Sequence, residues 1–191
     1  MTSESLQAIV EALIFASDRA LSLKKIVDLM GDVAESEIQS AIQAIQQRYQ
    51  NSSHGIYLEE VAGGYHFRTK ITHAAWLQKL FESKPLRMSR AQLETLAMVA
   101  YRQPITRIEI DAIRGVDSSH LLRTLLDRKL IRISGVKEVP GRPLLYSTTE
   151  DFLEFFNLKE LKDLPSLEQL KELNQKALEK DSEPIANDLL A

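Results

Sequence analysis

Hydrophobic residues along positions 3–50 recur every three or four residues, which predicts three amphipathic helices in a row. The first helix should end near Ser17, and the second should begin after Ser22 and stop at Gly31. The third has a capping-box pattern at Ser36 and Gln39. Its apolar stripe consists of Ile38, Ala41, Ile42, Ile45 and Tyr49.

The hydrophobic period then changes to that of strands. Segments 56–58 and 65–67 are rich in strand-forming residues and flank a turn at Ala62, Gly63 and Gly64, which predicts a β-hairpin. A short apolar helix with Trp76, Leu80 and Phe81 follows. Helix, helix, helix and hairpin is the order of a winged-helix domain, so we expect one in residues 1–84.

The same order returns in the second half of the chain. Ser89 and Thr106 each begin a capping-box pattern, and the second of these helices should end at Gly115. A shift of 84 positions places Ser22 on Thr106 and Gly31 on Gly115, which indicates an internal repeat. Leucines at 121, 122, 125 and 126 predict a third helix, and segments 130–133 and 144–146 predict strands around a proline-rich turn.

The predicted fold class is therefore mainly α with small β-hairpins (α+β), built as two tandem winged-helix domains. We assign residues 1–84 and 85–160 to these domains, with the linker near Ser83, Lys84 and Pro85. Residues 161–191 should form a C-terminal helix, with Leu167, Leu170 and Leu173 on one face, and a flexible tail.

Composition narrows the function to binding. The sequence has no cysteine, and its four histidines lack metal-ligand spacing, so we expect neither a metal site nor another cofactor. It has no phosphate-binding glycine motif and no nucleophile elbow, so we expect no enzyme. No apolar run approaches the roughly 20 residues that span a bilayer, and we expect a cytoplasmic protein with no membrane partner.

A winged-helix DNA-binding transcriptional regulator is the alternative. In the first domain, the third helix begins with Glu35 and Glu37, which would repel phosphate. Net charge is −3, and no part of the chain is strongly basic, although residues 89–156 hold eight of the twelve arginines. We therefore expect at most weak, nonspecific DNA contact.

Two long motifs of the second half carry a family resemblance: AYRQPITRIEIDAIRGVDSS at 100–119 and VPGRPLLYSTTEDFLEFFNL at 139–158. They resemble the segregation and condensation protein B family, the kite subunits of bacterial SMC-kleisin condensin complexes. The resemblance implies a non-enzymatic homodimer that binds the kleisin subunit, segregation and condensation protein A, and through it the SMC ATPase heads. It also implies a nucleoid-associated role in chromosome condensation and segregation during the cell cycle.

Candidate site residues follow from these motifs. Partner-binding candidates are Tyr101, Arg102, Arg114, Val116 and Arg142, because arginine and tyrosine are enriched at protein contacts. For the neighbouring Gly115 and Asp117 we favour structural roles. Gly115 should stop a helix in the left-handed conformation, and Asp117 should be an N-cap. We expect Arg123 and Arg128 to be solvated beside Asp127. Trp76, Leu80 and Phe81 have the apolar character of core residues and are the candidates for the dimer interface.

Overall fold

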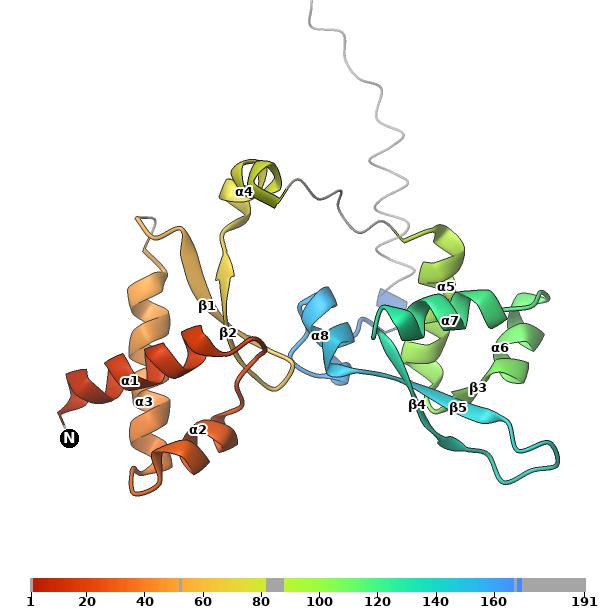
Figure 1. Cartoon of the computed structure of the whole chain (residues 1–191), viewed down its shortest axis with the longest axis horizontal. Helices are drawn as coiled ribbons and strands as arrows, with labels where there is room; N and C mark the ends of the chain where they lie inside the picture. Colours follow the sequence, from red (N-terminus) through yellow and green to blue (C-terminus); the bar gives the residue numbers. More distant parts are fainter. Residues whose placement is uncertain (1, 52, 82–87, 167, 170–191) are drawn as a thin grey trace, which may run out of the picture. The chain divides into compact units, whose positions relative to one another are not determined.

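The computed structural model describes residues 2–51, 53–81, 88–166 and 168–169. The chain divides into two compact units, Met1–Glu160 and Leu161–Ala191. The described part has eight α-helices and two small antiparallel sheets, which confirms a mixed fold of helices and short strands (Figure 1). The predicted linker at 83–85 and the leucines at 167, 170 and 173 lie outside the described residues, and the domain division near residue 84 stays a prediction.

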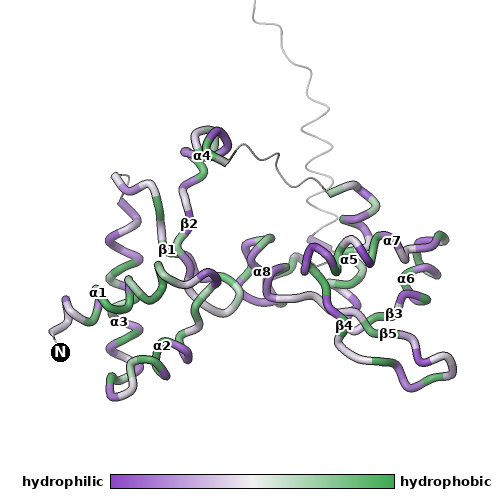
Figure 2. The backbone as a smooth tube through the Cα atoms, viewed as in Figure 1, coloured by the Kyte–Doolittle hydropathy of each residue, from purple (hydrophilic) through white to green (hydrophobic). Residues whose placement is uncertain are grey.

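Three helices open the first unit: α1 (Ser3–Ala16), α2 (Leu23–Met30) and α3 (Glu35–Tyr49). Their buried faces form one apolar cluster, and Figure 2 shows hydrophobic and hydrophilic residues interleaved along these helices. The side chain of Ser22 accepts a hydrogen bond from the Lys25 N–H, so the predicted N-cap of α2 is confirmed. The cluster consists of Leu6, Val10, Ile14, Ile26, Ile38, Ala41, Ile42, Ile45 and Leu58.

The predicted capping box of the third helix is wrong. The helix begins one residue before Ser36, and its N-cap is Ala34, which makes no side-chain cap hydrogen bond. Instead, the Ser36 carbonyl accepts a hydrogen bond from the Ser40 hydroxyl at 2.9 Å, and the Gln39 amide donates to Glu35 at 3.3 Å. The sequence pattern was present, but the helix start lies too early for it to act as a cap.

The strands β1 (Ile56–Val61) and β2 (Gly64–Thr69) form the predicted hairpin, with Ala62 and Gly63 at its turn. An isolated bridge joins Leu21 to Tyr65 through two backbone hydrogen bonds of 2.9 and 3.0 Å. Gly64 allows this approach, because a Cβ at this position would lie 2.7 Å from the Leu21 carbonyl carbon. The hairpin continues into η1 (Ile71–His73) and α4 (Ala74–Phe81).

The second group of elements starts with α5 (Arg90–Arg102), β3 (Ile105–Thr106), α6 (Arg107–Arg114) and α7 (Ser119–Asp127). Both predicted capping boxes, at Ser89 and Thr106, are present. Gly115 ends α6 in the left-handed conformation, at φ 72°, as the sequence predicted. The Gln103 side chain then joins the end of α5 to the sheet by accepting hydrogen bonds from the N–H and hydroxyl of Thr148, at 2.8 and 3.0 Å.

The strands β4 (Ile131–Val136) and β5 (Leu144–Thr148) complete a three-stranded sheet in the order β3-β5-β4. The two-residue strand β3 was not predicted, because so short a segment has no visible period. Helix α8 (Glu150–Phe156) follows, and η2 (Leu161–Asp163) belongs to the second unit.

The internal repeat has a structural counterpart. Helices α2 and α3 start at Leu23 and Glu35, and α6 and α7 start 84 positions later, at Arg107 and Ser119. The residue two positions before the start of each short second helix also pairs with a strand: Leu21 bridges to β2, and Ile105 pairs with β5. The same sequence register therefore produces the same local structure twice.

Candidate interaction surfaces

Helix α4 exposes a large apolar surface. Trp76 and Leu80 are 71% and 72% exposed, and Ile71 in the preceding turn is 86% exposed. Lys79 places its ammonium group 4.7 Å from the centre of the Trp76 ring, a cation–π contact that leaves most of the ring uncovered. The expectation that these residues belong to a core is therefore wrong for Trp76 and Leu80 within this chain. The side chain of Phe81 lies outside the described residues.

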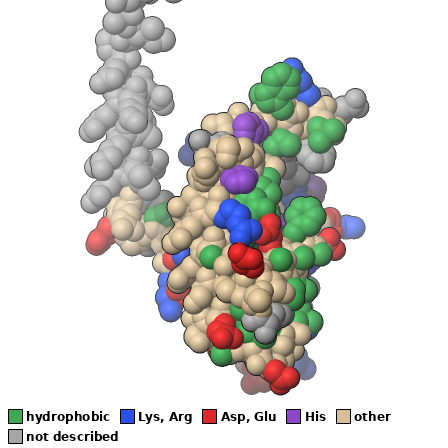
Figure 3. Space-filling view, turned by 90° about the vertical axis from the view of Figure 1, so that its left-hand side faces the viewer, with side chains coloured by type: hydrophobic (Ala, Val, Ile, Leu, Met, Phe, Trp, Pro, Cys, Tyr) green, Lys and Arg blue, Asp and Glu red, His purple; other side chains and the backbone are tan. Residues whose placement is uncertain are grey.

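A second apolar surface lies along α1, α3 and the hairpin, and sequence analysis did not identify it. Phe15 is 73% exposed and borders a hollow of about 400 Å³. Its ring lies 6.4 Å from that of Phe67, which in turn lies 5.0 Å from that of Tyr49. Figure 3 shows hydrophobic side chains gathered on this side of the first unit. The hollow is lined by Ala8, Glu11, Ala12, Phe15, Tyr49, Ile56 and Phe67.

One polar network borders this hollow. The Tyr49 hydroxyl donates a hydrogen bond of 2.6 Å to Glu11, and Arg48 forms an ion pair of 2.9 Å with the same carboxylate. The hydrogen bond to Glu11, together with burial, raises the pKa of Tyr49 above its usual value. Glu11 is thus held by two partners, and it fixes the end of α3 against α1.

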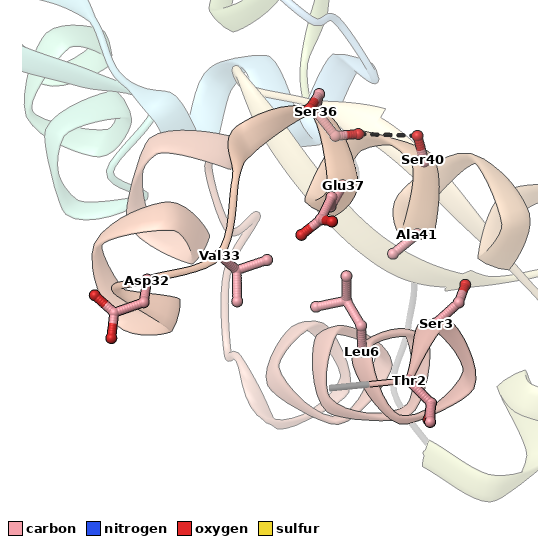
Figure 4. A pocket seen from close by; sticks show the side chains of 9 residues that line it. All are labelled: Thr2, Ser3, Leu6, Asp32, Val33, Ser36, Glu37, Ser40 and Ala41. Atoms are coloured by element: carbon pink, nitrogen blue, oxygen red, sulfur yellow. Dashed lines mark hydrogen bonds between the residues drawn. The ribbon is translucent and has the colours of Figure 1, made fainter.

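Another hollow, of about 470 Å³, lies where the beginnings of α1 and α3 meet (Figure 4). Leu6, Val33 and Ala41 point toward its middle, while Glu37 and Asp32 supply its charged groups. Both charges are negative, so this hollow does not favour phosphate. It is lined by Thr2, Ser3, Leu6, Asp32, Val33, Ser36, Glu37, Ser40 and Ala41.

Two predicted partner-binding residues lie at the end of α5. Tyr101 and Arg102 are both exposed and occupy its last two positions, as expected. Within the described part of the chain, the Arg102 guanidinium forms no hydrogen bond or ion pair. The residue that follows the helix, Gln103, is hydrogen-bonded to β5, and this end of the helix is therefore held in place.

The corner between α6 and α7 is braced from within. Asp117 accepts hydrogen bonds from the hydroxyl and the N–H of Ser119, at 2.7 and 3.2 Å, and these bonds, the hydroxyl first, lower its pKa. Arg107 adds an ion pair to Asp117 at 3.0 Å. The predicted N-cap role of Asp117 is wrong, because the N-cap of α7 is Ser118, which makes no side-chain cap hydrogen bond. Asp117 lies one residue earlier and braces the start of the helix through Ser119.

Two partner candidates flank this corner. Val116 is 56% exposed, which leaves its side chain accessible. Arg114 is half-buried and donates a hydrogen bond of 3.1 Å to the Ser118 hydroxyl, so part of its guanidinium already has a structural role.

Arg142 lies in the turn between β4 and β5, exposed and at φ 39°, and its N–H donates to the Val139 carbonyl. The base of this turn is tied to α6 by Lys137, whose ammonium group lies 2.7 Å from Glu109. Val116 and Arg114 lie at the opposite end of α6 from Glu109. The ion pair between the turn and α6 therefore lies away from Arg114 and Val116.

Arg128 is not a solvated surface residue, contrary to expectation. It is half-buried at the end of α7, and one of its η nitrogens is buried with no hydrogen-bond partner among the described residues. Arg123, by contrast, is exposed. Arg128 therefore belongs to the packing of the second half, and Arg123 is the suitable reference for a solvated arginine.

Among the described residues, no group of three or more histidine, aspartate or glutamate side chains could hold a metal ion. No helix in that part is long and apolar enough to cross a bilayer.

Comparison with known proteins identifies relatives along most of the chain. The family model described as segregation and condensation complex subunit ScpB matches residues 8–167. Segregation and condensation protein B of Syntrophotalea carbinolica is 44% identical over 177 residues, covering 93% of this chain and 89% of that protein. The protein of the same name from Geobacillus thermodenitrificans is 50% identical over 163 residues, covering 84% and 78%.

One similar solved structure is a crystallised dimer of an ScpB N-terminal domain complexed with ScpA peptide. Its sequence is 40% identical to the matching part of this chain. The match covers 40% of this chain and 95% of the crystallised chain, with a TM-score of 0.38. The family model spans well over half of the chain, and both relatives exceed 40% identity over most of their own length. This chain therefore belongs to the ScpB family of segregation and condensation complex subunits.

Proposed function

We propose that this chain is a non-enzymatic, kleisin-binding subunit of a bacterial SMC condensin complex that supports chromosome condensation and segregation. The match of the family model over residues 8–167 carries the proposal, because it spans all helices and strands from the middle of α1 to α8. In this proposal the kleisin is segregation and condensation protein A, ATP hydrolysis belongs to the SMC heads, and the protein acts in the cytoplasm at the nucleoid.

The proposal includes two tandem winged-helix domains. Each half has three helices followed by a two-stranded antiparallel pair, and a short segment before the second helix of each half pairs with one strand. The offset of 84 residues from the start of α2 to that of α6, and from α3 to α7, supports this assignment. Expression of residues 1–81 alone tests it, since an independent domain should unfold cooperatively.

The dimer surface is proposed to include α4. Two large apolar side chains more than 70% exposed on one short helix are unusual for a monomer, and burying them against a second copy would remove this area from water. Trp76 is the best anchor, because tryptophan is enriched among residues that dominate binding energy. Phe81 stays a candidate by its position at the end of α4.

The kleisin surface is proposed to include Arg102 and Arg142 together with Tyr101, Arg114 and Val116. Arg102 stands at a fixed helix end and Arg142 on a turn, and neither guanidinium has a partner within the described part of the chain. An arginine that becomes buried against a carboxylate partner costs about 2 kcal/mol or more on truncation, whereas a solvated one costs a few tenths.

Calorimetric titration of the full chain with the kleisin of the same organism tests this surface. Arg102→Ala and Arg142→Ala should each weaken the affinity by about tenfold or more, since 1.4 kcal/mol corresponds to a factor of ten. Arg123→Ala, at an exposed position of α7, is the matched control and should leave the affinity unchanged. Wild-type affinity in both variants would show that the kleisin binds elsewhere.

A DNA-binding regulator remains the second candidate function and has weaker support. Glu35 and Glu37 occupy the first turn of α3, the end with which a recognition helix enters the negatively charged major groove. The N–H groups at the turn of the β1–β2 hairpin already donate to carbonyls of this chain. A DNA regulator would bind one sequence preferentially and lose affinity steeply with salt, and fluorescence anisotropy with random and selected duplexes distinguishes the two functions.

A further inference from the structure

The turn of the β1–β2 hairpin is covered by residues that follow α8. The N–H groups of Ala62 and Gly63 donate hydrogen bonds of 2.9 Å to the carbonyls of Leu158 and Lys159, and all four residues belong to the unit Met1–Glu160. Ala62 and Gly63 have φ of 51° and 70°. They lie between the last paired residues of the hairpin, Val61 and Gly64, so the ladder does not use these two donors.

Side chains reinforce this contact on both sides. The Glu154 carboxylate accepts a hydrogen bond of 3.1 Å from the Ala20 N–H, and the Glu154 carbonyl accepts one of 3.0 Å from Arg68. Asp151, on the same face of α8 as Glu154, pairs with Arg19 at 3.5 Å.

Beyond the helix, two side chains reach β1. The Asn157 amide donates to Glu59 at 2.7 Å, and the Lys159 ammonium group pairs with Glu60 at 2.7 Å. These contacts on either side of the two backbone hydrogen bonds hold residues 151–159 along the hairpin turn.

The contacts named above are all hydrogen bonds and ion pairs. The apolar cluster of the first helices and hairpin contains no residue after Phe67. The principal packing pairs of elements likewise lie wholly before residue 82 or wholly after residue 87. The N–H of Phe152, the buried residue of α8, donates a hydrogen bond to the Thr149 hydroxyl. That hydroxyl donates in turn to the Lys129 carbonyl, so α8 is anchored to the second half of the chain. Exposed ion pairs and hydrogen bonds contribute little each, and contacts of this kind between substructures open readily.

We propose that residues Asp151–Lys159 are an intramolecular clasp that fastens α8 to the hairpin turn and opens reversibly. When the clasp is closed, the hairpin turn and Glu59 and Glu60 are engaged. When it opens, the N–H groups of Ala20, Ala62 and Gly63 lose their acceptors, Glu59 and Glu60 lose Asn157 and Lys159 as partners, and the tie between α8 and the hairpin is released. This clasp is a conformational device of the chain itself and does not depend on the proposed kleisin.

Amide hydrogen exchange measured by NMR on the full chain reports the clasp directly. The Ala62 and Gly63 amides should be protected in the wild type, because their acceptors lie in the clasp. The double variant Glu154→Ala/Lys159→Ala removes one hydrogen-bond acceptor and one charge pair, and should speed their exchange at least tenfold. The Tyr65 amide, which donates to the Leu21 carbonyl, should not change and serves as the internal control.

Glu150→Ala is the matched control variant, because it removes an exposed acidic residue of the same helix outside the clasp. It should leave the Ala62 and Gly63 amides protected. The proposal is overturned if both amides exchange at unprotected rates in the wild type, which would mean that the clasp does not close. It is also overturned if the double variant leaves their protection unchanged, which would mean that another contact protects them.

Discussion

The close approach of Gly64 to the backbone before α2 gives a sharp test of the first unit. A Cβ at this position would lie 2.7, 2.8 and 2.9 Å from the carbonyl carbon and oxygen of Leu21 and the nitrogen of Ser22. All three are backbone atoms and cannot rotate away as a flexible side chain can. Gly64→Ala therefore has to push the segment at Leu21 and Ser22 off the hairpin.

The magnitude follows from what this displacement breaks. Two backbone hydrogen bonds join Leu21 and Tyr65, and each contributes about 1 kcal/mol. Overpacking of a fitted site adds about 1–3 kcal/mol. Ser22 also caps α2, so its movement weakens that helix as well. We expect Gly64→Ala to lower the free energy of unfolding by about 3–5 kcal/mol.

Urea unfolding followed by circular dichroism measures this loss. Gly55→Ala is the matched control in the same unit, because the nearest atom to its Cβ would be a His73 ring carbon at 3.7 Å, an ordinary contact. That variant should stay within about 0.5 kcal/mol of the wild type. A Gly64→Ala variant as stable as Gly55→Ala would refute the close approach of Leu21 to the hairpin.

Three further predictions concern the dimer, the capping box and the α5 end. Trp76→Ala should raise the dimer dissociation constant by about tenfold or more in sedimentation experiments, whereas Leu29→Ala, an exposed leucine of α2, should not. Lys137 and Thr106 lower the pKa of Glu109 from 4.5 to about 2, so its carboxylate stabilises the fold above pH 4.5 and this contribution fades as the pH falls toward 2. Glu109→Gln should therefore lower the free energy of unfolding by about 1 kcal/mol or less at pH 7, because the pair is partly exposed, and by almost nothing near pH 2. An equal loss at both pH values would contradict this, and so would an equal loss from Glu138→Gln, at an exposed position. Gln103→Ala should cost about 1–3 kcal/mol in urea unfolding because it leaves the buried Thr148 N–H and hydroxyl without their acceptor, and a cost no larger than that of Gln47→Ala would count against it.

Helix boundaries were largely predictable because their signals are local. Ser22, Ser89 and Thr106 lie at the N-caps that the sequence indicated, and Gly115 lies at the predicted stop. Caps depend on one side chain and the backbone within the next turn, which a short sequence window contains. At Ser36 the same pattern misled, because the N-cap of α3 is Ala34 and Ser36 already lies within the first turn of the helix.

The surfaces were less predictable, because exposure depends on what the rest of the chain covers. Trp76 and Leu80 have the spacing and character of core residues, and only the structure shows that both side chains are more than 70% exposed and that none of the described elements buries them. Arg128 shows the reverse: a charged residue beside Asp127 suggested solvent exposure, but it is half-buried. The contact of residues 158 and 159 with the hairpin turn involves backbone atoms and had no sequence signal.

Light scattering of the chain with its kleisin tests the proposed function most directly. The full chain and segregation and condensation protein A of the same organism are purified separately, mixed at micromolar concentration and separated by size. We predict that the chain alone has the mass of a dimer and that the mixture elutes as one complex containing both proteins. A monomer that elutes apart from the kleisin would contradict the proposal.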